Sequence, residues 1–276
     1  MLNLVKRTIS GVALILIMIG SLLWNKYSYA AMMIFVLVIM MKEFLSMTMG
    51  NKYRISQSLA ILSSLVLFLL IYLYKGFNMA GKFLPLVFIP LLIIIINSLY
   101  VKDKKEFGKF ACLYTSLIYI ALPWSFINIA VFSPEGDYTG KLLLAFFIIV
   151  WASDVGGYIF GLAFGQKYGK KLFPSISPKK SWIGFWGGLG MAIVAAVILH
   201  FLGMLPFPLI HCIILAIIMN VTGVYGDLIE SQWKRYYKIK DSGTSMPGHG
   251  GLLDRFDSSL TAIPAGVIYL IMFNFL

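Results

Sequence analysis

Long apolar blocks, separated by short basic segments, run through almost the whole of this sequence of 276 residues. Hydrophobic residues make up 60% of the chain and charged residues only 12%. A soluble fold of this length needs more polar surface, whereas apolar runs of about 18 residues or more mark helices that cross a bilayer. The sequence therefore predicts an all-α integral membrane protein.

About nine transmembrane helices are expected from the apolar blocks, near residues 9–24, 27–47, 55–74, 83–100, 110–132, 142–164, 183–204, 208–230 and 258–276. Eighteen of the 23 Lys and Arg residues then fall in one alternate set of connecting segments, and four fall in the other set. Because basic loops stay in the cytoplasm, this bias predicts a cytoplasmic N-terminus and a C-terminus outside. The scattered positive charge suits anionic membrane lipids and not nucleic acid, since no basic groove with interleaved stacking aromatics is present.

The two halves of the chain differ in their polar content. Residues 1–141, with about five helices, are rich in Leu, Ile, Met and Phe and predict a scaffold. Residues 142–276, with about four helices, bring glycine and acidic residues into the membrane segments and predict the catalytic part, with cytoplasmic loops at 165–182 and 231–257. The four-residue spacing of Gly157, Gly161 and Gly165 predicts close helix packing.

Acidic residues inside the predicted spans require a reason, because a charge in a bilayer costs several kcal/mol. Asp154 lies in the sixth span, and Asp227 and Glu230 lie near the inner end of the eighth. On a helix Asp227, Ser231 and Lys234 share one face. Glu230 lies beside that face and is interpreted as a solvated charge at the helix end.

A glycine turn among acids and bases marks the last predicted loop. Gly248, Gly250 and Gly251 let the backbone approach a ligand and turn its N–H groups toward an anion. Asp254 and Asp257 offer the hard oxygen ligands that Mg²⁺ prefers, and neighbouring Lys and Arg residues would neutralise phosphate. This combination predicts a phosphoryl-transfer or nucleotidyl-transfer site.

The segment 231–257 reads S-x2-K-R-x4-K-D-x-G-x3-P-G-H-G-G-x2-D-R-x-D. It resembles the signature of the phosphatidate cytidylyltransferases, the CDP-diacylglycerol synthases. Trp151-Ala-Ser-Asp154 and Ser175-Ile-Ser-Pro-Lys-Lys180 resemble two further blocks of that family, in the same order. The resemblance covers roughly residues 142–260 and departs at Ile183, where the family usually carries an acidic residue.

The resemblance implies that a phosphatidate oxygen attacks the α-phosphorus of CTP, giving CDP-diacylglycerol and pyrophosphate. It also implies Mg²⁺ as cofactor, with a second cation left open, and a multi-pass protein of the cell inner membrane whose active site faces the cytoplasm. The partners implied are CTP, phosphatidic acid and membrane lipids, and a homodimer is left open.

Site residues are carried over position by position from the same resemblance. Asp227 and Asp254 would act in catalysis as metal ligands, from two segments expected to meet at the inner membrane surface, with Ser231 as a third ligand. Lys234 and Arg235 would also act in catalysis. Substrate binding would involve Ser231, Lys240, Asp241, Gly248, His249, Gly250, Gly251, Arg255, Lys179, Lys180, Ser177 and Asp154.

Three other functions remain alternatives at this point. A CTP-dependent lipid kinase, such as a polyprenol kinase, would transfer the γ-phosphate and release CDP. An ion-coupled transporter would explain Asp154 and Asp227, but it would not need the basic loops or the glycine turn. An alcohol phosphatidyltransferase is disfavoured, because its D-G-x2-A-R motif with trailing paired aspartates is missing from the sequence.

Overall fold

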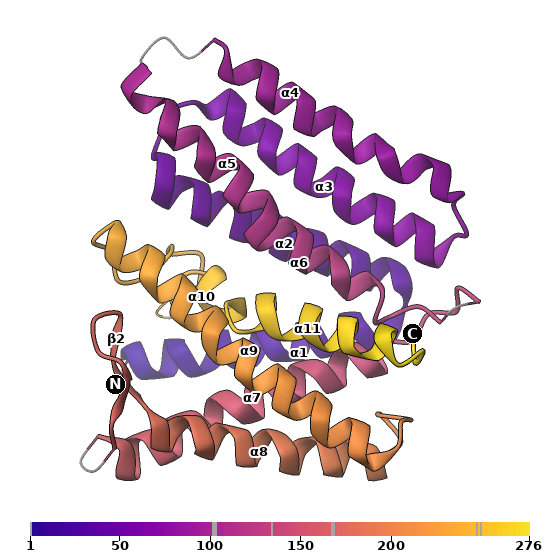
Figure 1. Cartoon of the computed structure of the whole chain (residues 1–276), viewed down its shortest axis with the longest axis vertical. Helices are drawn as coiled ribbons and strands as arrows, with labels where there is room; N and C mark the ends of the chain where they lie inside the picture. Colours follow the sequence, from indigo (N-terminus) through magenta and orange to yellow (C-terminus); the bar gives the residue numbers. More distant parts are fainter. Residues whose placement is uncertain (1, 101–103, 134, 167–168, 247, 249) are drawn as a thin grey trace. The chain divides into compact units, whose positions relative to one another are not determined.

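The computed structural model describes residues 2–100, 104–133, 135–166, 169–246, 248 and 250–276 (Figure 1). The chain divides into two compact units. Unit 1 comprises Met1–Gly140 together with Asp241–Arg255, and unit 2 comprises Lys141–Lys240 together with Phe256–Leu276. The segment 241–255, which follows a helix of unit 2 in the sequence, therefore packs with the N-terminal helices.

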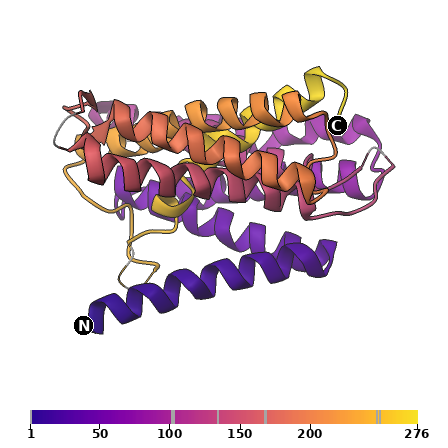
Figure 2. The same ribbon diagram turned by 90° about the horizontal axis from the view of Figure 1, so that it is seen from below.

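Unit 1 is built from helices, and its longest members come first in the chain. They are α1 (Leu2–Trp24), α2 (Lys26–Met49), α3 (Arg54–Gly76), the 3-10 helix η1 (Gly81–Val87), α4 (Phe88–Ser98), the 3-10 helix η2 (Lys104–Phe110), α5 (Ala111–Ser116), the π-helix η3 (Leu117–Ala121), α6 (Leu122–Ser125) and the 3-10 helix η4 (Phe126–Asn128). Figure 2 shows α1 as one unbroken rod beginning at the N-terminus. The short helix α10 (Leu253–Phe256) begins in unit 1 and ends on the first residue that belongs to unit 2.

The turn between α1 and α2 is defined by local sequence. Asn25 caps α2, because its side-chain oxygen accepts hydrogen bonds from the backbone N–H groups of Tyr27 and Ser28, both at 2.9 Å. Ser28 completes the capping box by accepting from the backbone N–H of Asn25.

Further along the unit, the buried Trp124 donates its indole N–H to the backbone oxygen of Met33 at 3.0 Å. That bond fixes α6 against α2.

Unit 2 consists of α7 (Lys141–Phe160), the π-helix η5 (Gly161–Gly165), strands β1 (Lys171–Phe173) and β2 (Ser177–Ser181), α8 (Trp182–Phe201), α9 (Leu209–Tyr236) and α11 (Ser259–Met272). In both views α7 and α8 run side by side (Figures 1 and 2). A Cβ atom added at Gly156 would lie 2.7 Å from the backbone oxygen of Gly187, and one at Gly184 would lie 2.9 Å from that of Gly157. The close packing predicted from the glycine spacing is therefore confirmed.

The loop between α7 and α8 contains a two-stranded antiparallel hairpin, in which Lys171 pairs with Ser181 and Phe173 with Ser177. The prediction of an all-α chain with a cytoplasmic loop at 165–182 did not include these strands. No apolar run or strong alternation marks these short strands, so they could not be predicted from the residue pattern. Ser181 ends β2 and also caps α8, because its hydroxyl accepts from the backbone N–H of Gly184 at 3.2 Å. The hairpin therefore leads directly into the start of a long helix.

Within the described residues, seven helical stretches are long and apolar enough to cross a membrane. They are Lys26–Met49, Arg54–Gly76, Gly81–Ser98, Glu106–Asn128, Lys141–Gly165, Trp182–Phe201 and Leu209–Tyr236. The first predicted span corresponds to a shorter apolar stretch, Ile9–Trp24, and the last corresponds to α11, which has 14 residues. The protein is thus a helical, multi-pass membrane protein, while the count of nine and the direction of insertion stay predictions.

Candidate active site

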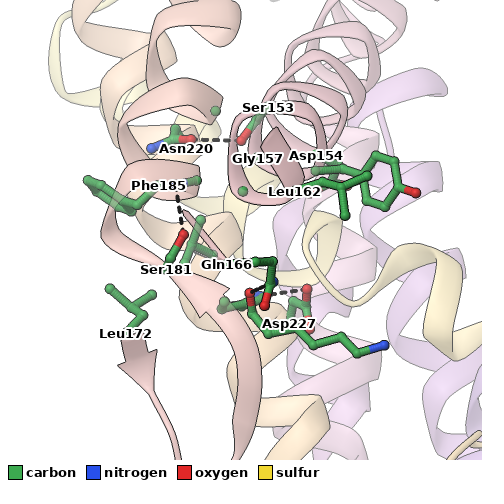
Figure 3. Close-up of a pocket in the computed structure, with 17 residues that line it drawn as sticks. Ser153, Asp154, Gly157, Leu162, Gln166, Leu172, Ser181, Phe185, Asn220 and Asp227 are labelled. Atoms are coloured by element: carbon green, nitrogen blue, oxygen red, sulfur yellow. Dashed lines mark hydrogen bonds and ion pairs between the residues drawn. The ribbon is translucent and has the colours of Figure 1, made fainter. Parts of the chain in front are cut away.

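A pocket of about 430 Å³ lies within unit 2, among α7, η5, the hairpin, α8 and α9 (Figure 3). Its polar lining consists of Ser153, Asp154, Tyr158, Gln166, Lys179, Lys180, Ser181, Asn220 and Asp227. The rest of the wall is glycine and apolar side chains, among them Leu162, Phe185 and Val224. The pocket therefore offers one environment for a charged group and another for a hydrocarbon group.

The charged part of this pocket is built around Asp227, on α9. Lys180, on β2, places its ammonium nitrogen 2.6 Å from Oδ2 of Asp227, and both side chains are partly accessible (25% and 32% exposed). Ser231, one helical turn after Asp227, donates its hydroxyl to Oδ1 at 3.2 Å. Two residues that the sequence separates by 47 positions are thus an ion pair at the pocket wall, within reach of a ligand.

The next acidic residue of α9 was wrongly interpreted as a solvated charge. Glu230 is 1% exposed and forms an ion pair with Lys234, one turn further along the helix. Lys234 was predicted to share the face of Asp227, but its ammonium group contacts Glu230, and its side chain is only 12% exposed. Helical periodicity correctly predicted which residues of α9 are one turn apart. It could not show that Glu230 and Lys234 would pair and be buried.

Two further carboxylates lie close to Asp227 in unit 2. The hydroxyl of Ser258 donates to Oδ1 of Asp154 at 3.4 Å, and the backbone N–H of Ser258 donates to Oδ1 of Asp257 at 2.6 Å. Burial raises the pKa of Asp257 well above its ordinary value, and the nearby carboxylates of Asp227, Glu230 and Asp154 raise it further. This part of unit 2 thus brings four carboxyl groups close enough to influence one another.

Arg235 contacts backbone groups and does not line the pocket. Its guanidinium donates to the carbonyl oxygens of Ile176, at the hairpin turn, and Ile239, at 3.3 and 3.4 Å. Ser177 begins β2, two residues before the pocket-lining Lys179. The hairpin turn and the end of α9 are therefore tied to each other, while Lys240 is exposed beyond the helix end.

The signature loop 241–255 belongs to unit 1, and two of its glycines have backbone conformations that other residues rarely adopt. Gly248 and Gly250 have φ angles of 77° and 85°, in the left-handed region. Met246 donates its N–H to the carbonyl oxygen of Gly250 at 3.0 Å, which closes the turn. His249 lies outside the described residues. Asp241 is exposed at the start of the loop, and Arg255 lies at its end.

Asp254 is held by the backbone of its own loop. Its Oδ2 accepts hydrogen bonds from the backbone N–H groups of Gly251 at 2.8 Å and Ser242 at 3.0 Å. The glycine turn was expected to present N–H groups to a ligand, but that of Gly251 points to this carboxylate. Asp254 and Asp227 belong to different units, so their expected meeting at one metal stays a prediction.

One polar residue of unit 1 was missed by the sequence analysis. Glu43, near the end of α2, is 8% exposed, and its carboxylate accepts from the backbone N–H groups of Leu252 at 3.0 Å and Leu253 at 2.8 Å. The signal was available, because an acidic residue within an apolar span calls for a partner. The prediction of the first half of the chain as scaffold assigned no role to this residue.

Across the described residues, no three His, Cys, Asp or Glu side chains cluster tightly enough to enclose a metal ion by themselves. Asp227 and the Ser231 hydroxyl nonetheless form a pair of hard oxygen donors in a region rich in carboxylates. Mg²⁺ commonly binds through one or two carboxylates and completes its shell with water and substrate phosphates. The donor set therefore fits Mg²⁺ bound together with a phosphorylated ligand.

The apolar spans and the pocket lined by lysine, aspartate and apolar side chains are compatible with a membrane-embedded enzyme that binds an amphiphilic, charged ligand. Comparison with known proteins makes this specific, because the model of the cytidylyltransferase family matches residues 5–273. The chain belongs to the cytidylyltransferase family and is a nucleotidyltransferase. The resemblance predicted from residues 231–257 is confirmed and extends over nearly the whole chain.

Similar curated proteins carry the name phosphatidate cytidylyltransferase. That of Bacillus subtilis is 34% identical over 212 residues, covering 75% of this chain and 76% of its own length. That of Staphylococcus haemolyticus is 29% identical over 266 residues, covering 96% and 98%. That of Staphylococcus aureus is 35% identical over 181 residues, covering 65% and 66%. The similarity therefore includes both units and is not restricted to the signature loop.

Proposed function

We propose that this protein is a phosphatidate cytidylyltransferase, which transfers CMP from CTP to phosphatidic acid. The observation that carries the proposal is the Lys180–Asp227 pair at the wall of a pocket that combines polar side chains with glycine and apolar lining. Such a pocket suits a ligand with a phosphate at one end and hydrocarbon at the other. The names of the similar proteins supply the reaction, and the pocket is compatible with its lipid substrate.

In the proposed reaction one phosphate oxygen of phosphatidate forms a bond to the α-phosphorus of CTP. The bond from the α-phosphorus to the bridging oxygen breaks, and pyrophosphate leaves with the electron pair. The nucleophile is already an anion at neutral pH, so the protein need not remove a proton from it. The main requirements are then orientation of the two anionic substrates and neutralisation of their charge.

Lysine residues of the hairpin are suited to the second requirement. Lys179 and Lys180 both line the pocket, and a phosphate could replace the carboxylate of Asp227 as the partner of Lys180. Asp227 would then be free to bind a cation together with Ser231. Mg²⁺ bound there would supply positive charge to the triphosphate and to the leaving pyrophosphate. Asp254 remains the candidate for the second carboxylate.

The proposed substrates differ in solubility, and this determines how each must reach the site. Phosphatidate stays in the bilayer, so a lateral path to the pocket between membrane helices is required. CTP arrives from the cytoplasm, which agrees with the predicted N-in orientation and with basic loops on that side. The proposal therefore places the reaction at the inner leaflet of the cell membrane.

A label-transfer assay on the purified protein in detergent tests this function. We expect label from [α-³²P]CTP to enter the lipid fraction when phosphatidate and Mg²⁺ are present, and label from [γ-³²P]CTP to leave as pyrophosphate. Transfer of γ-label into phosphatidate or polyprenol would instead identify a lipid kinase. No transfer of either label would contradict both functions and revive the transporter, which uptake into sealed vesicles would test.

A further inference from the structure

Glu43 connects the first half of the chain to the signature loop within unit 1. One oxygen of its carboxylate, Oε1, accepts hydrogen bonds from the backbone N–H of Leu252 and from the hydroxyl of Ser245. The other oxygen, Oε2, accepts from the backbone N–H of Leu253. Both oxygens of a buried side chain are thus engaged with one loop about 200 residues away in the sequence.

The loop is shaped to let this carboxylate approach. A Cβ atom added at Gly243 would lie 2.7 Å from Cδ of Glu43, and one at Gly251 would lie 2.8 Å from Oε2. Real Cβ atoms do not come this close, so any other residue at either position would displace the carboxylate or the loop. Neither glycine has a positive φ, so the close approach of Glu43, and at Gly251 also of the Ser242 hydroxyl, is what requires glycine at these positions.

The contacts of Glu43 lead directly to Asp254. Glu43 accepts hydrogen bonds from the backbone N–H groups of Leu252 and Leu253. These two residues immediately precede Asp254 in the chain. The carboxylate of Asp254 in turn accepts hydrogen bonds from the backbone N–H groups of Gly251 and Ser242, so both acidic residues hold the same loop. A buried, charge-assisted contact of this kind has a defined direction, which apolar packing lacks.

We propose that Glu43 is a positioning residue of the cytidylyltransferase reaction, which fixes the loop 241–255 so that Asp254 and Arg255 are presented in one orientation. The inference rests on the proposed function for the roles of Asp254 and Arg255, and on the contacts above for that of Glu43. The membrane helix α2 is therefore part of the catalytic apparatus and not only scaffold.

The kinetic test compares Glu43→Gln with a matched variant of the same helix. Gln offers one acceptor oxygen, and its NH₂ group would face one of the loop N–H groups, so the loop should shift. A displacement of about 1 Å at a reacting group can lower the rate of the reaction about a hundredfold. We therefore expect kcat to fall roughly tenfold to a hundredfold, while KM for CTP changes less than about threefold. Thr48→Val is the control, because the buried Thr48 hydroxyl bonds only within α2, to Phe44 and Leu45, among the contacts described. Its kcat should stay within about twofold.

A chemical probe of the loop separates positioning from general destabilisation. Ser242 is 6% exposed, and the two native cysteines, Cys112 and Cys212, are buried. A Ser242→Cys reporter should therefore resist a water-soluble maleimide in the otherwise unchanged protein. In combination with Glu43→Gln it should react at least about tenfold faster, and with Thr48→Val it should stay protected.

The outcomes distinguish the two hypotheses. Normal kcat in Glu43→Gln, or a low kcat with the reporter still protected, would overturn the positioning role. If Glu43→Gln does not fold, Ser245→Ala replaces it, since it removes one contact to the same carboxylate and should lower kcat severalfold, roughly in proportion to one hydrogen bond. Unchanged kcat and protection in Ser245→Ala would then count against the inference. An unsubstituted protein without CMP transfer would refute the proposed function, while the maleimide reaction would still report on the contact with Glu43.

Discussion

The two carboxylates expected to bind metal are held in opposite ways in the two units. In unit 2, Asp227 contacts side chains, the ammonium of Lys180 and the hydroxyl of Ser231, at the wall of a pocket. In unit 1, Asp254 contacts backbone N–H groups of its own loop. Side-chain partners can exchange for a ligand, whereas the backbone contacts of Asp254 maintain the shape of the loop. The partners of the aspartate in unit 2 can therefore be replaced by a ligand, whereas those of the aspartate in unit 1 maintain the local structure.

The largest expected effect tests this difference directly. Asp227→Asn and Asp254→Asn should each lower kcat roughly a thousandfold or more, as expected when a group that stabilises transferring phosphate is lost. Only Asp254→Asn should expose the Ser242→Cys reporter to maleimide, because only that substitution disturbs the loop. Asp137→Asn, at an exposed acid of unit 1, is the control and should retain activity. Equal maleimide reactivity in the two Asp variants would remove the distinction between the two environments.

Buried and exposed ion pairs extend the comparison to stability. Glu230→Gln leaves Lys234 without its buried partner charge and should destabilise the protein by about 3–5 kcal/mol. Lys52→Met removes a pair with Glu106 in which Lys52 is 62% exposed, and should cost about 1 kcal/mol or less. Thermal unfolding in detergent measures both changes. A Lys52→Met protein that melts as early as Glu230→Gln would contradict the assignment of a buried pair to α9.

The exchange of partners proposed for Lys180 predicts a smaller, kinetic effect. Lys180→Met should lower kcat/KM for phosphatidate roughly tenfold to a hundredfold, since a charged hydrogen bond to phosphate would be lost. Lys170→Met changes an exposed lysine of the same loop that does not line the pocket, and kcat/KM should stay within about twofold. Initial rates in mixed micelles with varied phosphatidate provide the measurement. If both variants lose activity equally, the effect would depend on the total positive charge of the loop and not on the position of Lys180 in the pocket.

The smallest expected effect concerns the helix packing that forms the pocket. Gly156→Ala places a methyl group 2.7 Å from the backbone oxygen of Gly187 and should destabilise unit 2 by about 1–3 kcal/mol. Gly190→Ala, at an α8 position with nothing within 4 Å, should be neutral or stabilise by up to about 1 kcal/mol, because alanine favours a helix. Apparent Tm values should therefore move in opposite directions. A lower Tm for both would indicate that the close approach of α7 and α8 is not what Gly156 serves.

Local and spacing-dependent features could be predicted well. The apolar runs gave the helical membrane class, and the spaced motif of residues 231–257 gave the family that the comparison confirms. The four-residue glycine spacing also predicted the close approach of two helices. These features depend on residues near one another in the chain, where composition and period carry the information.

Partners distant in the sequence could not be predicted in the same way. The hairpin that brings Lys180 to Asp227 has short strands without an apolar pattern. The burial of Glu230 depends on which face of α9 the neighbouring helices cover. Nothing in the spacing of residues could therefore separate a solvated carboxylate from a buried one.

By itself, the sequence determined that this chain folds as membrane helices and carries the cytidylyltransferase signature, because hydrophobic length and motif spacing are properties of the linear chain. Only the tertiary structure decided which acid meets which partner. It joins Glu43 to a loop about 200 residues later, and it assigns Asp254 to backbone contacts and Asp227 to a lysine. A carboxylate that loses water must find donors wherever the packing of the helices provides them, and that packing is a property of the whole fold.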